Sequence, residues 1–350
     1  MSYSIENKVI LVTGASGTVG RKLIEGLLSE HPKLIYAIDQ NEQGIFELEH
    51  IYTKTTSPVI PLVGDVRDQN RMFQLIAEVD IVIHGAAMKH VPIAERTPFD
   101  AVNTNIIGLQ NILNAARHHN IERVLFMSSD KAVNPTNVMG STKLLGEKMT
   151  SALMNDFSPS KKTIFFSTRF GNVIGSNGSV AGLFTDQILS RGPLTITSDS
   201  MTRFIMSVEQ SVSLLIASLK QAQGGEVYVM KMPSVRIADL AKVLVDHYSE
   251  KLSLPDIDVQ YIGQRPGEKM YEELITEEEI RRTTDEGDFY VIRPAFDKVF
   301  SCFHEGYAKM TTQVASAQIG INDYRSDHVT QMSADEIHDF LLTYNLFREV

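Results

Sequence analysis

The chain has 350 residues, of which 43% are hydrophobic and 22% charged, as expected for a globular protein with a substantial core. Its formal net charge is −10, and no basic run is longer than two residues, which argues against a nucleic-acid-binding protein. The single cysteine, Cys302, leaves no intrachain disulfide and no cysteine-based metal site, so we expect a reducing, cytoplasmic setting and no metal. No apolar run is long enough for a signal-peptide core or a membrane span.

The first half of the chain alternates short apolar runs with segments of helical spacing. Such runs, without strict alternation, are typical of strands buried on both faces, and helices between them indicate a parallel sheet. We therefore expect an α/β fold with a Rossmann-type, doubly wound parallel sheet. The strands are expected at residues 8–13, 34–38, 59–63, 81–84, 124–127 and 163–168, and the helices at residues 21–30, 102–120 and 143–154.

The second half has a different pattern, and its content of Gly, Ser and Pro rises between residues 171 and 193. After about residue 276 the pattern weakens. Because the strand at 227–230 should return to the main sheet, we expect two interleaved domains. A Rossmann domain would cover 1–172 with about 207–232, and a smaller C-terminal substrate-binding domain would cover 173–206 and 233–350. The further helices are expected at residues 211–221, 237–247 and 334–344, and a further short strand at 259–262.

A glycine-rich turn follows the first expected strand and opens the first helix. Gly14, Gly17 and Gly20 have the GxxGxxG spacing used by short-chain dehydrogenase/reductase enzymes. Glycine lets a pyrophosphate approach closely, and the N–H groups at the helix N-terminus meet its negative charge. Taken alone, such glycines more often make only a tight turn. Here, however, further features of a dinucleotide site follow in order at the ends of the next strands.

Asp39 ends the second strand, where a carboxylate binds the adenosine ribose hydroxyls and repels a 2′-phosphate. No Arg or Lys follows in residues 40–43, so we expect NAD and not NADP. Asp65 and Val66 are placed to meet the adenine, and Ala86 and Ala87 to line the cleft. The residues expected to bind NAD are Gly14, Ser16, Gly17, Thr18, Val19, Asp39, Asp65, Val66, Ala86, Ala87, Asn105 and Lys143.

Polar side chains cluster where the fifth strand ends, at Ser129, Asp130 and Lys131. Neighbouring Asp and Lys residues are usually a solvated pair, but the carboxyl ends of strands are where an open α/β sheet binds its ligand. A hydroxyl, a carboxylate and an ammonium at this position provide an acid/base set. The Tyr-x-x-x-Lys pattern of short-chain dehydrogenase/reductase enzymes would pair Lys143 with residue 139, which is Met139 and cannot move a proton. The enzyme is therefore either inactive, or its proton transfers are made by other residues.

Five motifs together resemble those of a known family. They are KHVP at residues 89–92, SDKAVNPTNVMG at 129–140, RFGNV at 169–173, MTRF at 201–204 and RPGEK at 265–269. In this order they resemble the UDP-N-acetylglucosamine 4,6-dehydratases of bacterial polysaccharide and glycan biosynthesis. The resemblance runs from about residue 8 to residue 277 and is weak from 278 to 350.

The resemblance implies a mechanism. NAD would oxidise carbon 4 of the sugar, and the resulting ketone would acidify the proton at carbon 5. By position, Lys131 would be the base that takes this proton, and Asp130 the acid that protonates the departing carbon 6 hydroxyl. Ser129 would hydrogen-bond the carbon 4 oxygen, and Lys143 would hold the nicotinamide ribose. Family members carry either Tyr or Met at the position of Met139, so our hypothesis is that Asp130 also takes the carbon 4 hydroxyl proton, helped by Ser129.

The resemblance also implies a UDP-sugar substrate and a homo-oligomeric assembly. Guanidinium groups match the geometry of a diphosphate, which suits two arginines of the expected site. The motif around Met139 resembles members that retain the configuration at carbon 5, whereas residues 201–204 resemble inverting ones. We expect retention, and inversion stays open. The residues expected to bind substrate are Lys89, Asn172, Ser179, Val180, Arg203, Arg265 and Glu268.

Two other readings stay open. A nucleotide-sugar epimerase, or a dehydratase of another sugar nucleotide, would also use bound NAD, but an epimerase product keeps the carbon 6 hydroxyl. A catalytically silent NAD-binding sensor or scaffold belongs to a different class. Met139 is its best support, and the Asp130–Lys131 pair argues against it because a binding protein has no need of that pair.

Overall fold

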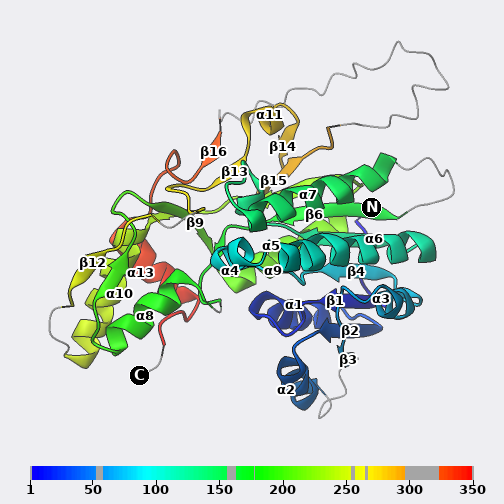
Figure 1. Cartoon of the computed structure of the whole chain (residues 1–350), viewed down its shortest axis with the longest axis horizontal. Helices are drawn as coiled ribbons and strands as arrows, with labels where there is room; N and C mark the ends of the chain where they lie inside the picture. Colours follow the sequence, from blue (N-terminus) through cyan, green and yellow to red (C-terminus); the bar gives the residue numbers. More distant parts are fainter. Residues whose placement is uncertain are drawn as a thin grey trace.

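Figure 1 shows a computed structural model of the chain, which describes residues 2–52, 58–155, 163–176, 178–253, 257–264, 267–295 and 323–348. In these residues the largest sheet has nine strands, and the strands from β3 to β10 run parallel. In spatial order the strands are β14 (Thr283–Asp285), β15 (Phe289–Ile292), β10 (Val227–Met230), β6 (Ile164–Arg169), β5 (Arg123–Met127), β4 (Ile81–His84), β1 (Val9–Thr13), β2 (Leu34–Asp39) and β3 (Val59–Val63).

Helices cover both faces of this sheet, as the two separate clusters of buried side chains show. On β1, Ile10 and Val12 pack with residues of one helix pair, whereas Leu11 packs with residues of the other, because successive side chains of a strand point to opposite faces. The first pair is α1 (Thr18–Leu28) and α9 (Val208–Gln221), and the second is α3 (Gln69–Ile76) and α6 (Gly108–His119). The strand order reverses between β1 and β4, which is the point where doubly wound sheets bind their ligands.

A smaller unit with its own buried cluster lies beside the sheet, on the left in Figure 1. Helices α8, α10 and α13 supply most of this cluster, and short strands connect it to the carboxyl ends of the large sheet. The helices are α8 (Val180–Leu189), α10 (Ile237–Leu252) and α13 (Ala334–Thr343). The short strands are β7 (Asn172–Val173), β8 (Leu194–Ile196), β9 (Thr202–Met206), β11 (Ser234–Arg236), β12 (Val259–Tyr261), β13 (Glu273–Ile275) and β16 (Tyr324–Arg325).

The expected fold class is confirmed, and the expected strands of the large sheet lie where the sequence indicates. Several helix boundaries differ by a few residues, as for α1, α9 and α10, and two differences concern the site. Helix α7 (Val138–Ala152) begins before residue 143, because the Asn137 side chain accepts a hydrogen bond from the Gly140 N–H and caps it. The expected helix at 102–120 is interrupted by the π-helix η1 (Asn103–Ile107) and preceded by the short helices α4 (Val91–Arg96) and α5 (Pro98–Val102).

Several elements were not expected from the sequence, among them two helices and two strands. Helices α2 (Glu42–Tyr52) and α11 (Glu277–Ile280) lie in segments without a clear periodic pattern. Strands β14 and β15 join the large sheet by antiparallel pairing, with β15 against β10, although their residues fall in the range 233–350 that we assigned to the substrate domain.

Cys302 and Arg265 lie outside the described residues. Within the described ranges, none of the helices has the length and apolar character needed to cross a membrane.

Candidate active site

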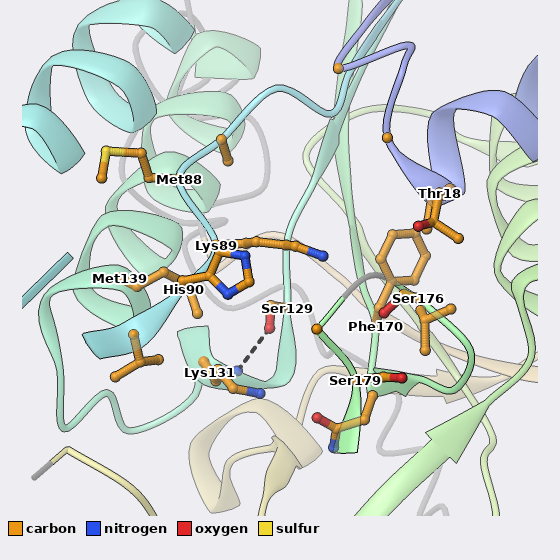
Figure 2. A pocket seen from close by; sticks show the side chains of 18 of the residues that line it. Thr18, Met88, Lys89, His90, Ser129, Lys131, Met139, Phe170, Ser176 and Ser179 are labelled. Atoms are coloured by element: carbon orange, nitrogen blue, oxygen red, sulfur yellow. Dashed lines mark hydrogen bonds between the residues drawn. The ribbon is translucent and has the colours of Figure 1, made fainter. Parts of the chain in front are cut away.

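A pocket of about 920 Å³ lies at the carboxyl ends of β1, β4 and β5 and continues into the smaller unit. Its walls come from segments far apart in the sequence. Figure 2 shows Lys89 reaching across the pocket near Ser129 and Lys131, with Met88 and Met139 on one side and Thr18 and Phe170 on the other. The pocket therefore joins the predicted cofactor residues to the predicted reactive cluster.

The glycine-rich turn forms one wall of the pocket. Gly14 has a φ of +72°, and a Cβ there would lie 2.8 Å from the backbone N of Ala86, so only glycine fits. A Cβ on Gly20 would overlap the carbonyl oxygen of Gly14. Gly17 is the N-cap of α1 and makes no side-chain cap, and the first turn of the helix lines the pocket, so the positive end of the helix dipole lies at the pocket wall. This close approach and the uncapped helix fit the pyrophosphate of a dinucleotide.

Asp39 lines the same wall of the pocket. Its Oδ2 accepts hydrogen bonds from the Ser16 N–H at 3.1 Å and the Ser16 hydroxyl at 2.8 Å, and its Oδ1 accepts from the Asn41 N–H. Among the described residues no cation pairs with it, whereas Asp65 is held by two nitrogens of Arg67. An unpaired carboxylate at this point fits ribose hydroxyls and disfavours a 2′-phosphate.

The other predicted cofactor residues divide into two groups. Thr18, Val19, Val66, Ala86 and Ala87 line the pocket, together with Ser16, Gly17, Asp65 and Lys143. Asn105 is buried in the π-helix and lies behind the lining. Its side chain accepts from the Met88 N–H at 2.8 Å and donates to the Met88 carbonyl and to Thr142 of α7. Asn105 therefore fixes the loop after β4 against α7, and π-helical turns of this kind are frequent at functional sites.

Ser129, Asp130 and Lys131 form a compact hydrogen-bonded unit at the start of the 3₁₀ turn η2 (Asp130–Ala132). The Ser129 hydroxyl donates to Asp130 Oδ1 at 2.6 Å, and Lys131 Nζ donates to the same oxygen at 3.0 Å. Asp130 is fully buried, and its Oδ2 has no hydrogen-bond partner among the described residues. Ser129 and Lys131 line the pocket, whereas Asp130 lies behind them and is joined to the lining through their hydrogen bonds.

Lys143 and Met139 lie on α7 beside this unit, and both line the pocket. Lys143 Nζ donates to the Met127 carbonyl at 2.7 Å and lies 4.8 Å from the centre of the Phe126 ring. Burial lowers the pKa of Lys143 to about 8, against the opposing charge of Glu147. The thioether of Met139 takes the place of a phenol, so no acid or base stands next to Lys143 at that position.

The segment 267–273 forms the opposite wall and brings a residue that the sequence analysis missed. Glu272 is 3% exposed and lines the pocket. Its Oε1 lies 3.6 Å from Lys131 Nζ and 3.6 Å from Arg203 Nε. In the sequence Glu272 and Glu273 form an acidic pair that looks like a solvated surface, and only the fold reveals that Glu272 is buried beside Lys131.

Most of the predicted substrate residues meet in the pocket. Arg203 is 8% exposed, and its guanidinium donates to the carbonyls of Thr202 and Lys269 and faces Glu268 at 3.9 Å. Burial lowers the pKa of Lys89. Arg265 lies outside the described residues. The predicted residues that line the pocket on this side are Lys89, Asn172, Ser179, Val180, Arg203 and Glu268.

Residues 10–294 match the family described as "Polysaccharide biosynthesis protein". An uncharacterized membrane protein of Methanocaldococcus jannaschii is 46% identical over 296 residues, 84% of this chain and 88% of that protein. An inverting UDP-N-acetylglucosamine 4,6-dehydratase of Campylobacter jejuni is 37% identical, over 82% of this chain and 83% of that protein. A UDP-glucose 4-epimerase of Rickettsia canadensis is 35% identical over 98% of both.

Solved structures of similar proteins have the same fold. Pen from Bacillus thuringiensis is 35% identical, with a TM-score of 0.88 over 98% of this chain and 99% of that one. The UDP-glucose 4-epimerase of Bifidobacterium longum, solved with NAD⁺ and UDP, shares the fold at 20% identity, with a TM-score of 0.62 over 74% of this chain and 88% of that one. The chain belongs to the polysaccharide biosynthesis protein family, a group of nucleotide-sugar dehydratases and epimerases with the short-chain dehydrogenase/reductase fold.

Proposed function

We propose that the protein is a UDP-N-acetylglucosamine 4,6-dehydratase that uses NAD. The observation that carries this proposal is the contact between Asp130 and Lys131, 3.0 Å apart at the reactive end of a pocket whose other end fits a dinucleotide. Bound NAD would supply the reversible oxidation that makes carbon 4 a ketone and returns the hydrogen to carbon 6. All the proton transfers would then fall to residues of the chain.

The first proton transfer concerns the carbon 4 hydroxyl. Met139 cannot accept its proton, whereas Ser129 lines the pocket and donates to Asp130 at 2.6 Å. The hydroxyl proton passes to the Ser129 oxygen while the Ser129 proton passes to Asp130. The carbon 4 oxygen is thereby freed to form a ketone, and Asp130 becomes a carboxylic acid.

The elimination adds Lys131 to the Ser129–Asp130 pair. Lys131 Nζ takes the proton from carbon 5, which the adjacent ketone has acidified. The carbon 6–oxygen bond breaks, and the departing oxygen takes the proton of the Ser129 hydroxyl and leaves as water, while Ser129 takes the proton held by Asp130. Lys131 then returns a proton to carbon 5. The sugar has lost one water, and each residue ends in the protonation state in which it started.

The remaining residues bind and orient. The charge of Lys143 would lie beside the nicotinamide ribose and stabilise negative charge that develops on the carbon 4 oxygen. Lys89, Asn172, Ser179, Val180 and Glu268 would contact the UDP-sugar. Arg203 has both terminal nitrogens engaged by backbone carbonyls and its Nε 3.6 Å from Glu272, so its contact to the diphosphate would require one of these contacts to open. Arg265 stays a second candidate.

A second candidate function is that of a nucleotide-sugar 4-epimerase, because the relatives named UDP-glucose 4-epimerase match 98% of the chain at 34–35% identity. An epimerase needs one acid/base at carbon 4 and no base at carbon 5. The Asp130–Lys131 pair supplies more proton-transfer groups than that reaction uses, and this favours the dehydratase.

Mass spectrometry of the product formed from UDP-N-acetylglucosamine tests the proposal. The dehydratase gives a UDP-sugar that has lost one water. An isobaric product would support the epimerase. The absence of any product, with the chain folded and NAD bound, would support a silent binding protein. Proton NMR of the same product reports the configuration at carbon 5, where we propose retention.

Two further expectations are kept as proposals. We propose that residues 1–172 with about 207–232 bind NAD and that 173–206 and 233–350 bind substrate, apart from β14 and β15, which pair with the large sheet. We also propose a homo-oligomer, which the exposed side chains of Phe99, Val102 and Ile107 on neighbouring helical segments support.

A further inference from the structure

Lys131 is in the wrong protonation state to act as a base. Burial lowers the pKa of its amine, but the Asp130 and Glu272 carboxylates outweigh this effect and raise the pKa above its ordinary value. Lys131 is therefore an ammonium ion at neutral pH, and an ammonium ion cannot take the proton from carbon 5. The proposed elimination requires that Lys131 first gives up a proton. Of the two carboxylates beside it, Asp130 at 3.0 Å takes the proton of the carbon 4 hydroxyl in the proposed reaction, which leaves the second group at 3.6 Å.

Glu272 is that group, and it is held firmly beside Lys131. The Glu272 N–H donates to the Ser326 hydroxyl at 2.9 Å, and Lys269 Nζ donates to the Val133 carbonyl at 2.7 Å. The Asn137 side chain donates to the Gly267 carbonyl at 3.0 Å. These contacts clamp the segment 267–273 onto the loop that carries Lys131, and so they fix the separation of 3.6 Å between Glu272 Oε1 and Lys131 Nζ.

The surroundings of Glu272 allow it to hold a proton. Its Oε2 is buried and has no hydrogen-bond partner among the described residues. The charged groups that face it are Asp130, Lys131, Arg203 and Lys269. Burial, together with the Asp130 charge, raises the pKa of Glu272 above its ordinary value, although the three cations act in the opposite direction. A buried carboxylate without a full set of donors accepts a proton more readily than a solvated one.

We propose that Glu272 takes a proton from Lys131 before the elimination and returns it after the product has formed. In this step Lys131 Nζ moves from 3.6 Å to hydrogen-bond distance of Glu272 Oε1, one N–H bond of Lys131 breaks and an O–H bond forms on Glu272, and no electrons are gained or lost. The neutral amine of Lys131 then accepts the carbon 5 proton. Glu272 acts through Lys131, whose protonation state it sets, and is therefore a positioning residue. This inference rests on the proposed dehydratase function.

The pH dependence of kcat tests this role. If the proton moves between Lys131 and Glu272, the neutral amine forms without the help of solvent, so the wild-type kcat should be flat between about pH 6 and pH 7.5. In Glu272→Gln the proton must leave to solvent. We expect kcat to fall by about tenfold or more at neutral pH and to rise with pH with a slope near one in log kcat, because a single group loses one proton. The KM for the UDP-sugar should change little.

Glu273→Gln is the matched control. It removes the same charge from the neighbouring position, where the side chain accepts a hydrogen bond from Asn134, and its pH profile should stay flat. Glu272→Asp keeps a carboxylate and should restore a flat profile at a lower rate, which decides the matter if Glu272→Gln does not fold. A wild-type-like profile for Glu272→Gln, or a rising profile for Glu272→Asp, would overturn the inference. A wild-type enzyme that forms no dehydrated product would overturn the proposed function first.

Discussion

Two buried groups of charges lie near the ends of neighbouring strands, and they are satisfied to different degrees. In the Arg169 cluster, Arg169 of β6 pairs with Glu147 of α7 and Glu279 of α11, and its nitrogens also reach the Leu274 carbonyl. All these contacts measure 2.7–2.8 Å, and the three side chains are 1–6% exposed. All three guanidinium nitrogens of Arg169 therefore donate to acceptors at hydrogen-bond distance.

In the Lys131 cluster, Asp130, Lys131, Arg203 and Glu272 are joined more loosely. One contact is 3.0 Å and two are 3.6 Å, and in the described chain one oxygen of Asp130 and one of Glu272 are buried without a partner. A satisfied buried ion pair resists any change of protonation, because breaking it leaves an unpaired charge. An under-satisfied one keeps room for a proton. We conclude that the Arg169 cluster stabilises the fold and that the Lys131 cluster is suited to proton transfer.

The largest effect is expected for Asp130→Asn. The amide keeps the shape of the side chain but accepts no proton, so we expect kcat to fall by about 10²–10⁴-fold, the usual contribution of a general acid/base. The urea midpoint of unfolding should change little, since Asp130 is under-satisfied in the native fold. Steady-state kinetics and urea titration measure the two quantities. Full activity in this variant would remove Asp130 from the mechanism.

The opposite pattern is expected for Arg169→Met. This change leaves Glu147 and Glu279 buried without their cation, so the free energy of unfolding should fall by about 3–5 kcal/mol. The kcat of the enzyme that remains folded should change far less than in Asp130→Asn. Lys220→Met, which breaks the more exposed pair with Glu30, is the control and should cost about 1 kcal/mol or less. Equal losses of stability in the two variants would contradict the structural role of the Arg169 cluster.

His84 is a buried titratable group outside both clusters, and the shift of its pKa comes mainly from burial. Burial, with a smaller contribution from the Lys143 charge, lowers the pKa of His84 to about 3. The unfolded chain binds a proton below about pH 6.5 while the folded chain does not, so stability is lost as the pH falls. Between about pH 6.5 and pH 5 the loss from this residue should reach about 2 kcal/mol. Urea titrations at the two pH values should show a smaller loss in His84→Gln, and an unchanged loss would contradict the assignment.

Lys143 of the pocket interacts with the Arg169 cluster, because the negative charge of Glu147 raises the pKa of Lys143. With a pKa of about 8, Lys143 loses its proton as the pH rises through that value, and kcat/KM should then fall by up to about tenfold per pH unit. Glu147 raises this pKa, so Glu147→Gln should move the fall to lower pH. An alkaline limb that does not move in this variant would show that another group causes it.

The cofactor side of the pocket could be predicted from the sequence because its features are local. The glycine turn, Asp39 and the Ser129–Lys131 cluster each follow an apolar strand directly, and the carboxyl ends of parallel strands meet at one edge of the sheet. The order of the strands then brings them together. The same reasoning explains why the expected fold class and strand positions hold.

The other wall of the pocket could not be predicted in this way. Glu272 reaches Lys131 across a separation in sequence that no periodic pattern describes, and its acidic neighbours make it look solvent-exposed. Asn105 has a polar side chain near the cofactor loop, but only the contacts to Met88 and Thr142 show that it lies behind the lining. Strands β14 and β15 are short and follow a segment of weak pattern, and their place in the sheet depends on pairing with β10.

The most direct test of the proposed reaction follows a deuterium atom at carbon 4 of UDP-N-acetylglucosamine. The purified protein is incubated with this substrate in ordinary water, and the product is examined by NMR and mass spectrometry. The account predicts a dehydrated UDP-sugar with the deuterium on carbon 6, because the hydrogen removed from carbon 4 is returned within the same active site. Deuterium that stays on carbon 4 of an isobaric sugar, or that is missing from a dehydrated one, would contradict the account.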